Sequence, residues 1–131
     1  MGQQISAHLS FSEGYQGTLS LREGSIAIGV QDDQARPYDL LQGALVACLH
    51  STFLEILTKK RCELKFADYD VSGEKRDEVP TMLQSVHVKV ILPAGPHEDA
   101  YLKSMELATK YCSVYNTLSQ VAKMSYSIKF R

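Results

Sequence analysis

The residues of this sequence best suited to reactive chemistry are its three cysteines, Cys48, Cys62 and Cys112. A thiolate can attack a peroxide oxygen to give a sulfenic acid, and a second thiol can then convert that acid to a disulfide. The cysteine count is odd, and the first thirty residues show no basic, apolar leader. Both features predict free thiols in a reducing, cytoplasmic compartment.

Each cysteine occupies a different predicted environment. Cys48 lies in the middle of a long apolar helix, where a cysteine is more commonly a small buried hydrophobe than a nucleophile. Cys62 follows the basic run Lys59–Arg61 and is expected to be an incidental surface thiol, roughly 21 Å of helix away from Cys48. Cys112 falls between two predicted helices with Ser113 as a candidate N-cap, where backbone N–H groups can lower a thiol pKa. Any disulfide within the chain must involve Cys112, but spacing alone does not distinguish a redox pair from coincidence.

Other titratable residues give weaker signals. His50 lies two positions after Cys48, so a helix turns it about 200° away and the two cannot form a local dyad. Glu55 lies on the same helix face as Cys48, two turns on, either as a buried acid near the thiol or as a partly exposed carboxylate. The remaining histidines have no metal-ligand spacing, so no zinc site is predicted: His8, His87 and His97.

Alternating hydrophobic patterns predict half-buried strands, as over 5–11 and 83–92, and together with helical patterns they predict an α+β fold in one domain, residues 1–131. A helix is expected to open at Pro37, with Asp39 favouring its positive end. That helix is apolar nearly all round, which predicts cover on most sides. The predicted order is strands over 5–11, 18–21 and 25–30, a helix from 37 to about 59–61, strands over 66–75 and 83–92, helices over 97–111 and 114–122, and a strand over 125–130.

Composition excludes several classes of partner. The 131 residues carry 14 Lys and Arg against 15 Asp and Glu, a formal charge of −1, which does not favour nucleic acid or anionic lipid. Apolar residues make up 44% and charged residues 22%, as in ordinary globular proteins. The apolar stretch 40–57 is interrupted by polar residues and is predicted to be a core helix rather than a membrane span.

Two segments together suggest a family. Arg36–Leu41 followed by Ala44–Cys48, and Tyr111–Val114 followed by Thr117 and Leu118, resemble the OsmC/Ohr family, as does the spacing of 64 positions between Cys48 and Cys112. The resemblance implies an intertwined α+β homodimer with long central helices packed together and the cysteine pair near the interface. The strip of small residues that would permit such a close helix contact is Gly43, Ala47 and Ser51.

The resemblance also implies roles for the cysteines. Cys48 would attack an organic hydroperoxide and Cys112 would resolve the sulfenic acid to a disulfide. No bound cofactor is implied; a dithiol reductant such as a lipoylated protein would restore the thiols. A cation would hold the thiolate and polarise the peroxide, and a carboxylate would orient that cation.

The sequence departs from the hydroperoxidase pattern at three points. The first glycine turn, Glu13–Gly17, lacks the family's arginine; Tyr38 stands at the usual glutamate position, with Asp39 one residue later; and Ser113 replaces a proline. Arg22 or Arg36 could take the place of the missing arginine. The alternatives are that Arg22 is a solvated strand residue and that Arg36 is a loop residue beside the helix start. These departures place the chain nearer the general OsmC-like branch than the efficient organic hydroperoxide reductases.

Three functional hypotheses follow. The leading one is thiol-dependent reduction of organic or hydrogen peroxides by Cys48 and Cys112 in an oxidative or osmotic stress response. A second is a non-enzymatic dimeric module that binds a small hydrophobic ligand at its interface. A third is a redox sensor in which the same cysteine pair only reports oxidation.

Overall fold

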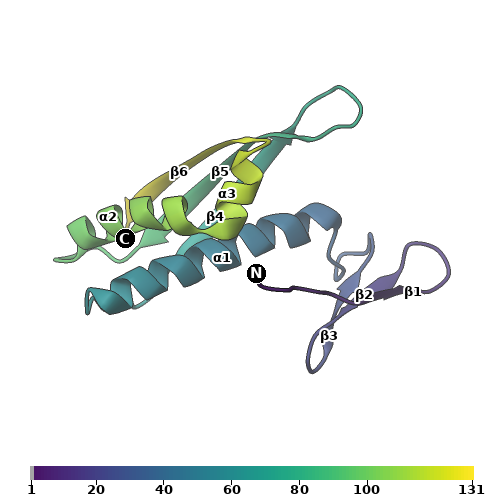
Figure 1. Cartoon of the computed structure of the whole chain (residues 1–131), viewed down its shortest axis with the longest axis horizontal. Coiled ribbons are helices and arrows are strands. Elements are labelled where there is room, and N and C mark those ends of the chain that lie inside the picture. The colour runs from purple at the N-terminus through teal and green to yellow at the C-terminus, as the bar shows by residue number, and fades with distance from the viewer. Residues whose placement is uncertain (1) are drawn as a thin grey trace. The chain divides into compact units, whose positions relative to one another are not determined.

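The computed structural model describes residues 2–131 and confirms an α+β fold. In these residues there are three helices and two separate three-stranded sheets, in the predicted order of strands and helices (Figure 1). The chain divides into two compact units, residues 1–41 and residues 42–131.

The first unit is an antiparallel meander of three short strands. They are β1 (Leu9–Phe11), β2 (Gly17–Ser20) and β3 (Ser25–Ile28). Gly14 and Gly24 take positive φ values of 74° and 81° in the connecting turns, a conformation that favours glycine. Leu19 of β2 stands opposite Leu9 on one side and Ile26 on the other.

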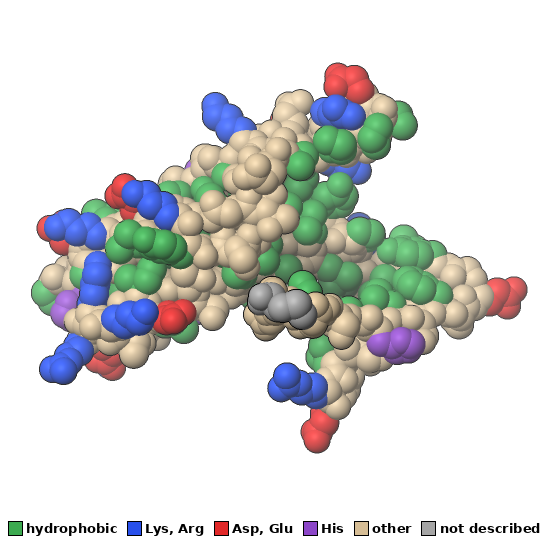
Figure 2. Space-filling view, viewed as in Figure 1, with side chains coloured by type: hydrophobic (Ala, Val, Ile, Leu, Met, Phe, Trp, Pro, Cys, Tyr) green, Lys and Arg blue, Asp and Glu red, His purple; other side chains and the backbone are tan. Residues whose placement is uncertain are grey.

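The prediction of a half-buried first strand over 5–11 is wrong in length and in burial. Only Leu9–Phe11 pairs with β2, and Ile5 is 87% exposed. Among residues 2–41, only Ile28 and Gly29 are buried, because the unit is a single layer of strands with no second layer of its own. Figure 2 accordingly shows hydrophobic side chains at the surface over β1–β3.

Helix α1 (Pro37–Lys59) begins where the sequence predicts. The backbone N–H of Arg36 donates to the Asp39 carboxylate at 2.9 Å, so the acid of the first turn also satisfies a backbone donor at the helix start. Farther along the helix, one stripe is buried and forms part of the core: Leu45, Leu49, Phe53 and Leu57.

The expectation that α1 is covered on most sides is wrong for the single chain. Ala44, Ala47 and Ser51 are exposed, because only the stripe through Leu49 and Phe53 faces the core. By length and composition alone α1 could cross a membrane, with a mean hydropathy of 1.6 over its best window. Its buried stripe and the polar residues along it are those of a core helix.

The second unit places helices on one face of a mixed sheet. Strands β4 (Asp68–Lys75) and β5 (Leu83–Leu92) are antiparallel, whereas β5 and β6 (Lys123–Phe130) are parallel. A parallel pair needs a crossover, and helices α2 (Glu98–Tyr111) and α3 (Ser113–Ser119) supply it. The predicted alternation in β5 is confirmed, and its inward residues are fully or almost fully buried: Val86, Val88, Val90 and Leu92.

Aromatic contacts connect the helices to each other and to the sheet. The Phe53 ring on α1 packs edge-on against Tyr101 on α2, with centroids 6.3 Å apart. His50 on α1 shares a 2.8 Å hydrogen bond with the Tyr69 hydroxyl on β4, so the His50 ring has a hydrogen-bond partner within the fold. The opposite face of the sheet is polar, and His87 there bonds Ser125 and Ser127.

We expect Phe53→Ala to lower the free energy of unfolding by about 3–5 kcal/mol, because a fully buried ring leaves a cavity between α1 and α2. Leu102→Ala is the matched control: Leu102 is 43% exposed on α2, and its loss should cost less than about 1 kcal/mol. Urea unfolding at one fixed protein concentration measures both. Equal losses for the two variants would contradict the placement of the core.

Candidate functional site

Cys48 and Cys112 meet in the folded second unit. Their Sγ atoms lie 3.1 Å apart, with the Cys112 thiol donating to the Cys48 sulfur. Both cysteines are unbonded, since a disulfide would require roughly 2.05 Å between the sulfurs. Two thiols far apart in the sequence thus lie in direct contact, close enough to bond after a small movement.

Cys112 is held by the junction between α2 and α3. Its backbone is extended, at φ −68° and ψ 118°, and its N–H donates to Ala108 O at 2.8 Å to end α2. Its sulfur accepts from the backbone N–H of Tyr115 at 3.4 Å, so Cys112 is itself the N-cap of α3. The prediction of Ser113 as that cap is wrong by one residue. The Cys112 side chain is fully buried, so its thiol is shielded from solvent.

Sequence reasoning missed Asn116, which braces this junction. Its side-chain amide donates to three carbonyls, those of Thr109 at 3.0 Å, Lys110 at 3.1 Å and Cys112 at 2.8 Å. These groups include carbonyls left without helical partners at the end of α2. The signal available in the sequence was an Asn in the first turn after a predicted helix break.

Cys48 is half-buried on α1 and faces the start of α3. Its sulfur lies 3.8 Å from the Ser113 hydroxyl oxygen. One turn on, the Thr52 hydroxyl donates to the Cys48 carbonyl at 3.0 Å, within the same helix. The sulfur of Cys48 is therefore bordered by Cys112 and Ser113 from the α2–α3 junction.

Hydrogen bonding separates the acidities of the two thiols. Burial alone would raise the pKa of Cys48, but hydrogen bonds from the Val114 N–H, the Cys112 thiol and Ser113 together hold it below its ordinary value. For Cys112, burial is the main cause that raises the pKa to about 11, and donating to Cys48 adds to it. Cys48 is thus the more acidic of the two thiols, and Cys112 keeps its proton to higher pH.

A family model described as OsmC-like protein matches residues 30–127. The chain belongs to the OsmC-like family. No curated protein sequence matches it.

Solved structures of OsmC-like and related proteins share this fold. An OsmC-like protein from Mycoplasma pneumoniae superimposes with a TM-score of 0.87 at 16% identity, covering 99% of each chain. A hypothetical protein from Aquifex aeolicus gives 0.81 at 24% identity, again over 99% of each chain. An organic hydroperoxide resistance protein from Elizabethkingia anophelis gives 0.76 at 14% identity over 100% of each chain.

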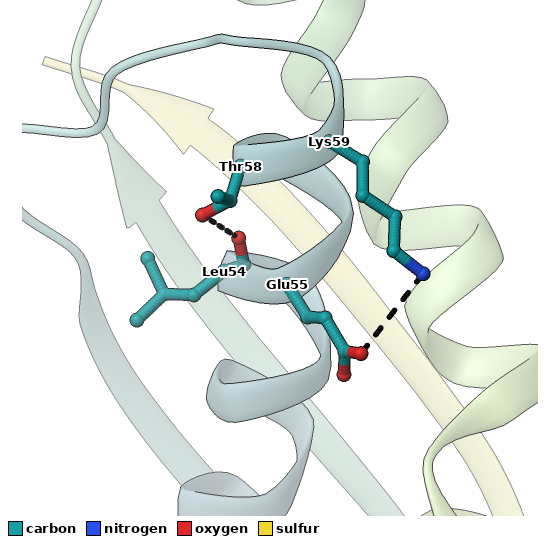
Figure 3. A network of polar contacts seen from close by, with 4 residues as sticks. All are labelled: Leu54, Glu55, Thr58 and Lys59. Atoms are coloured by element: carbon teal, nitrogen blue, oxygen red, sulfur yellow. Dashed lines mark hydrogen bonds and ion pairs between the residues drawn. The ribbon is translucent and has the colours of Figure 1, made fainter.

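The three other predicted site residues make contacts of a different kind in this OsmC-like chain. The Arg36 guanidinium donates to Val30 O at 3.0 Å, and Asp39 accepts from the Arg36 backbone, so both organise the start of α1 within the first unit. Glu55 lies 4.0 Å from Lys59, and its side chain is 70% exposed. Figure 3 shows these two side chains side by side on the last turns of α1. Glu55 is therefore a solvated carboxylate rather than a buried acid.

A small cavity of the OsmC-like chain is lined by residues that neighbour the two cysteines in the sequence. Its volume is about 280 Å³, and it is lined by Thr52, Glu55, Ile56, Lys59 and Tyr111. Thr52 follows Cys48 by one helical turn, and Tyr111 directly precedes Cys112. Cys62, by contrast, sits just beyond α1, where its backbone N–H donates to Leu57 O at 2.9 Å.

We expect iodoacetamide to label Cys48 at a lower pH than an ordinary thiol, because its thiolate is stabilised, and to label Cys112 only as the pH approaches about 11. Peptide mass spectrometry over a pH series distinguishes the three cysteines, with Cys62 as the internal reference. Labelling of Cys112 before Cys48 would contradict the assignment of the thiolate.

Proposed function

We propose that this OsmC-like chain reduces organic hydroperoxides, with Cys48 as the attacking thiol and Cys112 as the resolving thiol. The observation that carries the proposal is the 3.1 Å contact between the two sulfurs, in which Cys112 donates to Cys48. A structural pair of buried cysteines has no need of opposite pKa shifts, whereas a peroxidase needs one thiolate and one reserve thiol. The solved structures of organic hydroperoxide resistance proteins that share the fold are consistent with this activity.

In the first step the Cys48 thiolate attacks the terminal oxygen of the hydroperoxide. A sulfur–oxygen bond forms as the oxygen–oxygen bond breaks, and the departing alkoxide takes up a proton to become an alcohol. The sulfur is oxidised to a sulfenic acid and the peroxide is reduced. The hydrogen bonds on Cys48 favour this step because they increase the fraction of reactive thiolate at neutral pH.

In the second step Cys112 attacks the oxidised sulfur of Cys48. The sulfur–sulfur bond forms, the sulfur–oxygen bond breaks, and water leaves with the proton that Cys112 gives up. Contact between the sulfurs makes this intramolecular step faster than attack by an external thiol. An external dithiol, such as a lipoylated protein, then reduces the disulfide, which suits a chain acting in the cytoplasm.

The cavity lined by Thr52 and Tyr111, which neighbour the two cysteines in sequence, supports an organic substrate over hydrogen peroxide alone. Ile56, Tyr111 and the methyl group of Thr52 offer apolar surface, and its volume of about 280 Å³ exceeds what a hydroperoxyl group fills. The alkyl or aryl part of a hydroperoxide can occupy this space.

We expect wild-type protein to consume cumene hydroperoxide with a dithiol reductant, and Cys48→Ser to lose turnover by at least about a hundredfold because the nucleophile is gone. Cys112→Ser should still complete one turnover and stop at the sulfenic acid. Cys62→Ser is the matched control and should retain full activity. Single-turnover and steady-state assays of peroxide loss measure all four proteins.

If wild type and the three variants consume peroxide equally slowly, the peroxidase proposal fails. Ligand binding at the cavity would then be the better hypothesis. It predicts that the reduced protein binds a hydrophobic probe without reacting with it. Oxidation of wild type to the disulfide without sustained turnover by any dithiol would instead favour a redox sensor.

We also propose that residues 1–131 form one OsmC-like domain that is completed by a second copy of the chain. The first unit leaves exposed the large apolar side chains of Leu9, Phe11, Leu21 and Val30. Three short strands with so small a core do not fold stably alone. The exposed strip of small residues on α1, Gly43, Ala47 and Ser51, allows a second helix to approach closely.

Light scattering at micromolar concentration should therefore give the mass of two chains, because the apolar surface of the first unit needs a cover. Ala47→Glu places a charge in the proposed helix contact and should shift the protein toward one chain. Lys103→Glu, at an exposed site on α2, is the matched control. A wild-type mass of one chain would overturn the homodimer.

A further inference from the structure

The Ser113 hydroxyl lies 3.8 Å from the Cys48 sulfur, and no part of the peroxidase cycle above assigns it a role. Its side chain is exposed, so it is not held there by burial. Position 113 is also one of the three places where the sequence departs from the pattern that it resembles, which has a proline there. A proline has neither a hydroxyl group nor a backbone N–H to offer a neighbouring sulfur.

A thiolate in a half-buried site requires donors or a cation to offset the cost of its charge. Within residues 42–131, the groups that lower the pKa of Cys48 are all neutral: the Val114 N–H, the Cys112 thiol and the hydroxyl and N–H of Ser113. Val114 contributes a backbone N–H, which almost any residue at that position would supply, and Cys112 contributes the thiol already used in the proposed cycle. The Ser113 hydroxyl is the remaining side-chain donor.

We propose that Ser113 is a further catalytic residue, whose hydroxyl donates a hydrogen bond to the Cys48 sulfur and holds it as the attacking thiolate. This inference rests on the proposed function for its biological purpose, but its chemistry concerns only the state of Cys48. As sulfur passes its electrons to the peroxide oxygen, the hydroxyl keeps its own proton, and no additional reactant is needed.

The local backbone permits a graded set of variants. Ser113→Ala removes the hydroxyl alone, and Ser113→Thr retains it. Ser113→Pro removes the hydroxyl and the N–H together; Ser113 is the first residue of α3, a position that tolerates proline. Cys112 before it already has the extended backbone that a following proline requires.

The test is the pH dependence of Cys48 alkylation by iodoacetamide, read by peptide mass spectrometry in a Cys62→Ser background. Ser113→Ala should raise the midpoint by roughly one pH unit, the scale of a lost hydrogen bond to a charged group, and Ser113→Pro should raise it further. Ser113→Thr should restore the wild-type profile. Ser119→Ala is the matched control, since the Ser119 hydroxyl donates to Asn116 O within α3 and should leave the midpoint unchanged.

Superimposable profiles for wild type, Ser113→Ala and Ser113→Pro would overturn the proposal. A shift in Ser113→Ala that Ser113→Thr does not restore would also overturn it, because the cause would then be packing and not the hydroxyl. No peroxide is used, so a protein without peroxidase activity can still show the shift. Ser113→Ala decides alone if far-ultraviolet circular dichroism shows that Ser113→Pro does not fold.

Discussion

The hydrogen bond from Cys112 to Cys48 depends on nearly every other feature of the second unit. It requires a fixed spacing between α1 and α2, and the contact between the Phe53 and Tyr101 rings helps to set that spacing. It requires the chain to break after Tyr111, so that Cys112 leaves α2 and turns its sulfur toward α1. It also requires the crossover from β5 to β6, because a parallel pair brings α2 and α3 back over the same face of the sheet as α1.

Burial acts on both sulfurs, yet its net effect differs because their hydrogen-bond partners differ. Desolvation disfavours either thiolate. Cys48 accepts hydrogen bonds from several groups and its pKa lies below the ordinary value, whereas Cys112 donates a hydrogen bond to Cys48 and its pKa lies well above that value. The contact between the sulfurs acts on the two pKa values in opposite directions, because the Cys112 thiol donates to Cys48, and burial is the larger cause of the rise at Cys112. The two titrations belong to the pair, since a change of protonation at one sulfur changes the other.

The sequence predicts the elements well and the contacts between them poorly. Period-two alternation identified β5 to the residue, and Pro37 with Asp39 located the start of α1, because these signals are local. The capping of α3 by Cys112 and the bracing by Asn116 were missed, since a sulfur acceptor and an amide that reaches three carbonyls have no local pattern. The distance between the two cysteines is decided by the packing of three elements. From the sequence, only resemblance to a family suggested that they are paired.

The exposure of β1–β3 was mispredicted for a related reason: alternation shows which face is apolar, but not whether the same chain covers it.

Stabilising a thiolate and polarising a peroxide are separate requirements, and neutral donors serve them unequally. Hydrogen bonds from Val114, Cys112 and Ser113 can hold the charge on Cys48 at any salt concentration, because they act at contact distance and not through screened space. They add no positive charge near the oxygen that leaves, where negative charge develops as the oxygen–oxygen bond breaks. An arginine would serve both needs at once. Within residues 42–131 the groups that hydrogen-bond to Cys48 are all neutral. Its reaction with peroxide should therefore be limited by the leaving group, so that hydroperoxides with more acidic alcohols as products react faster.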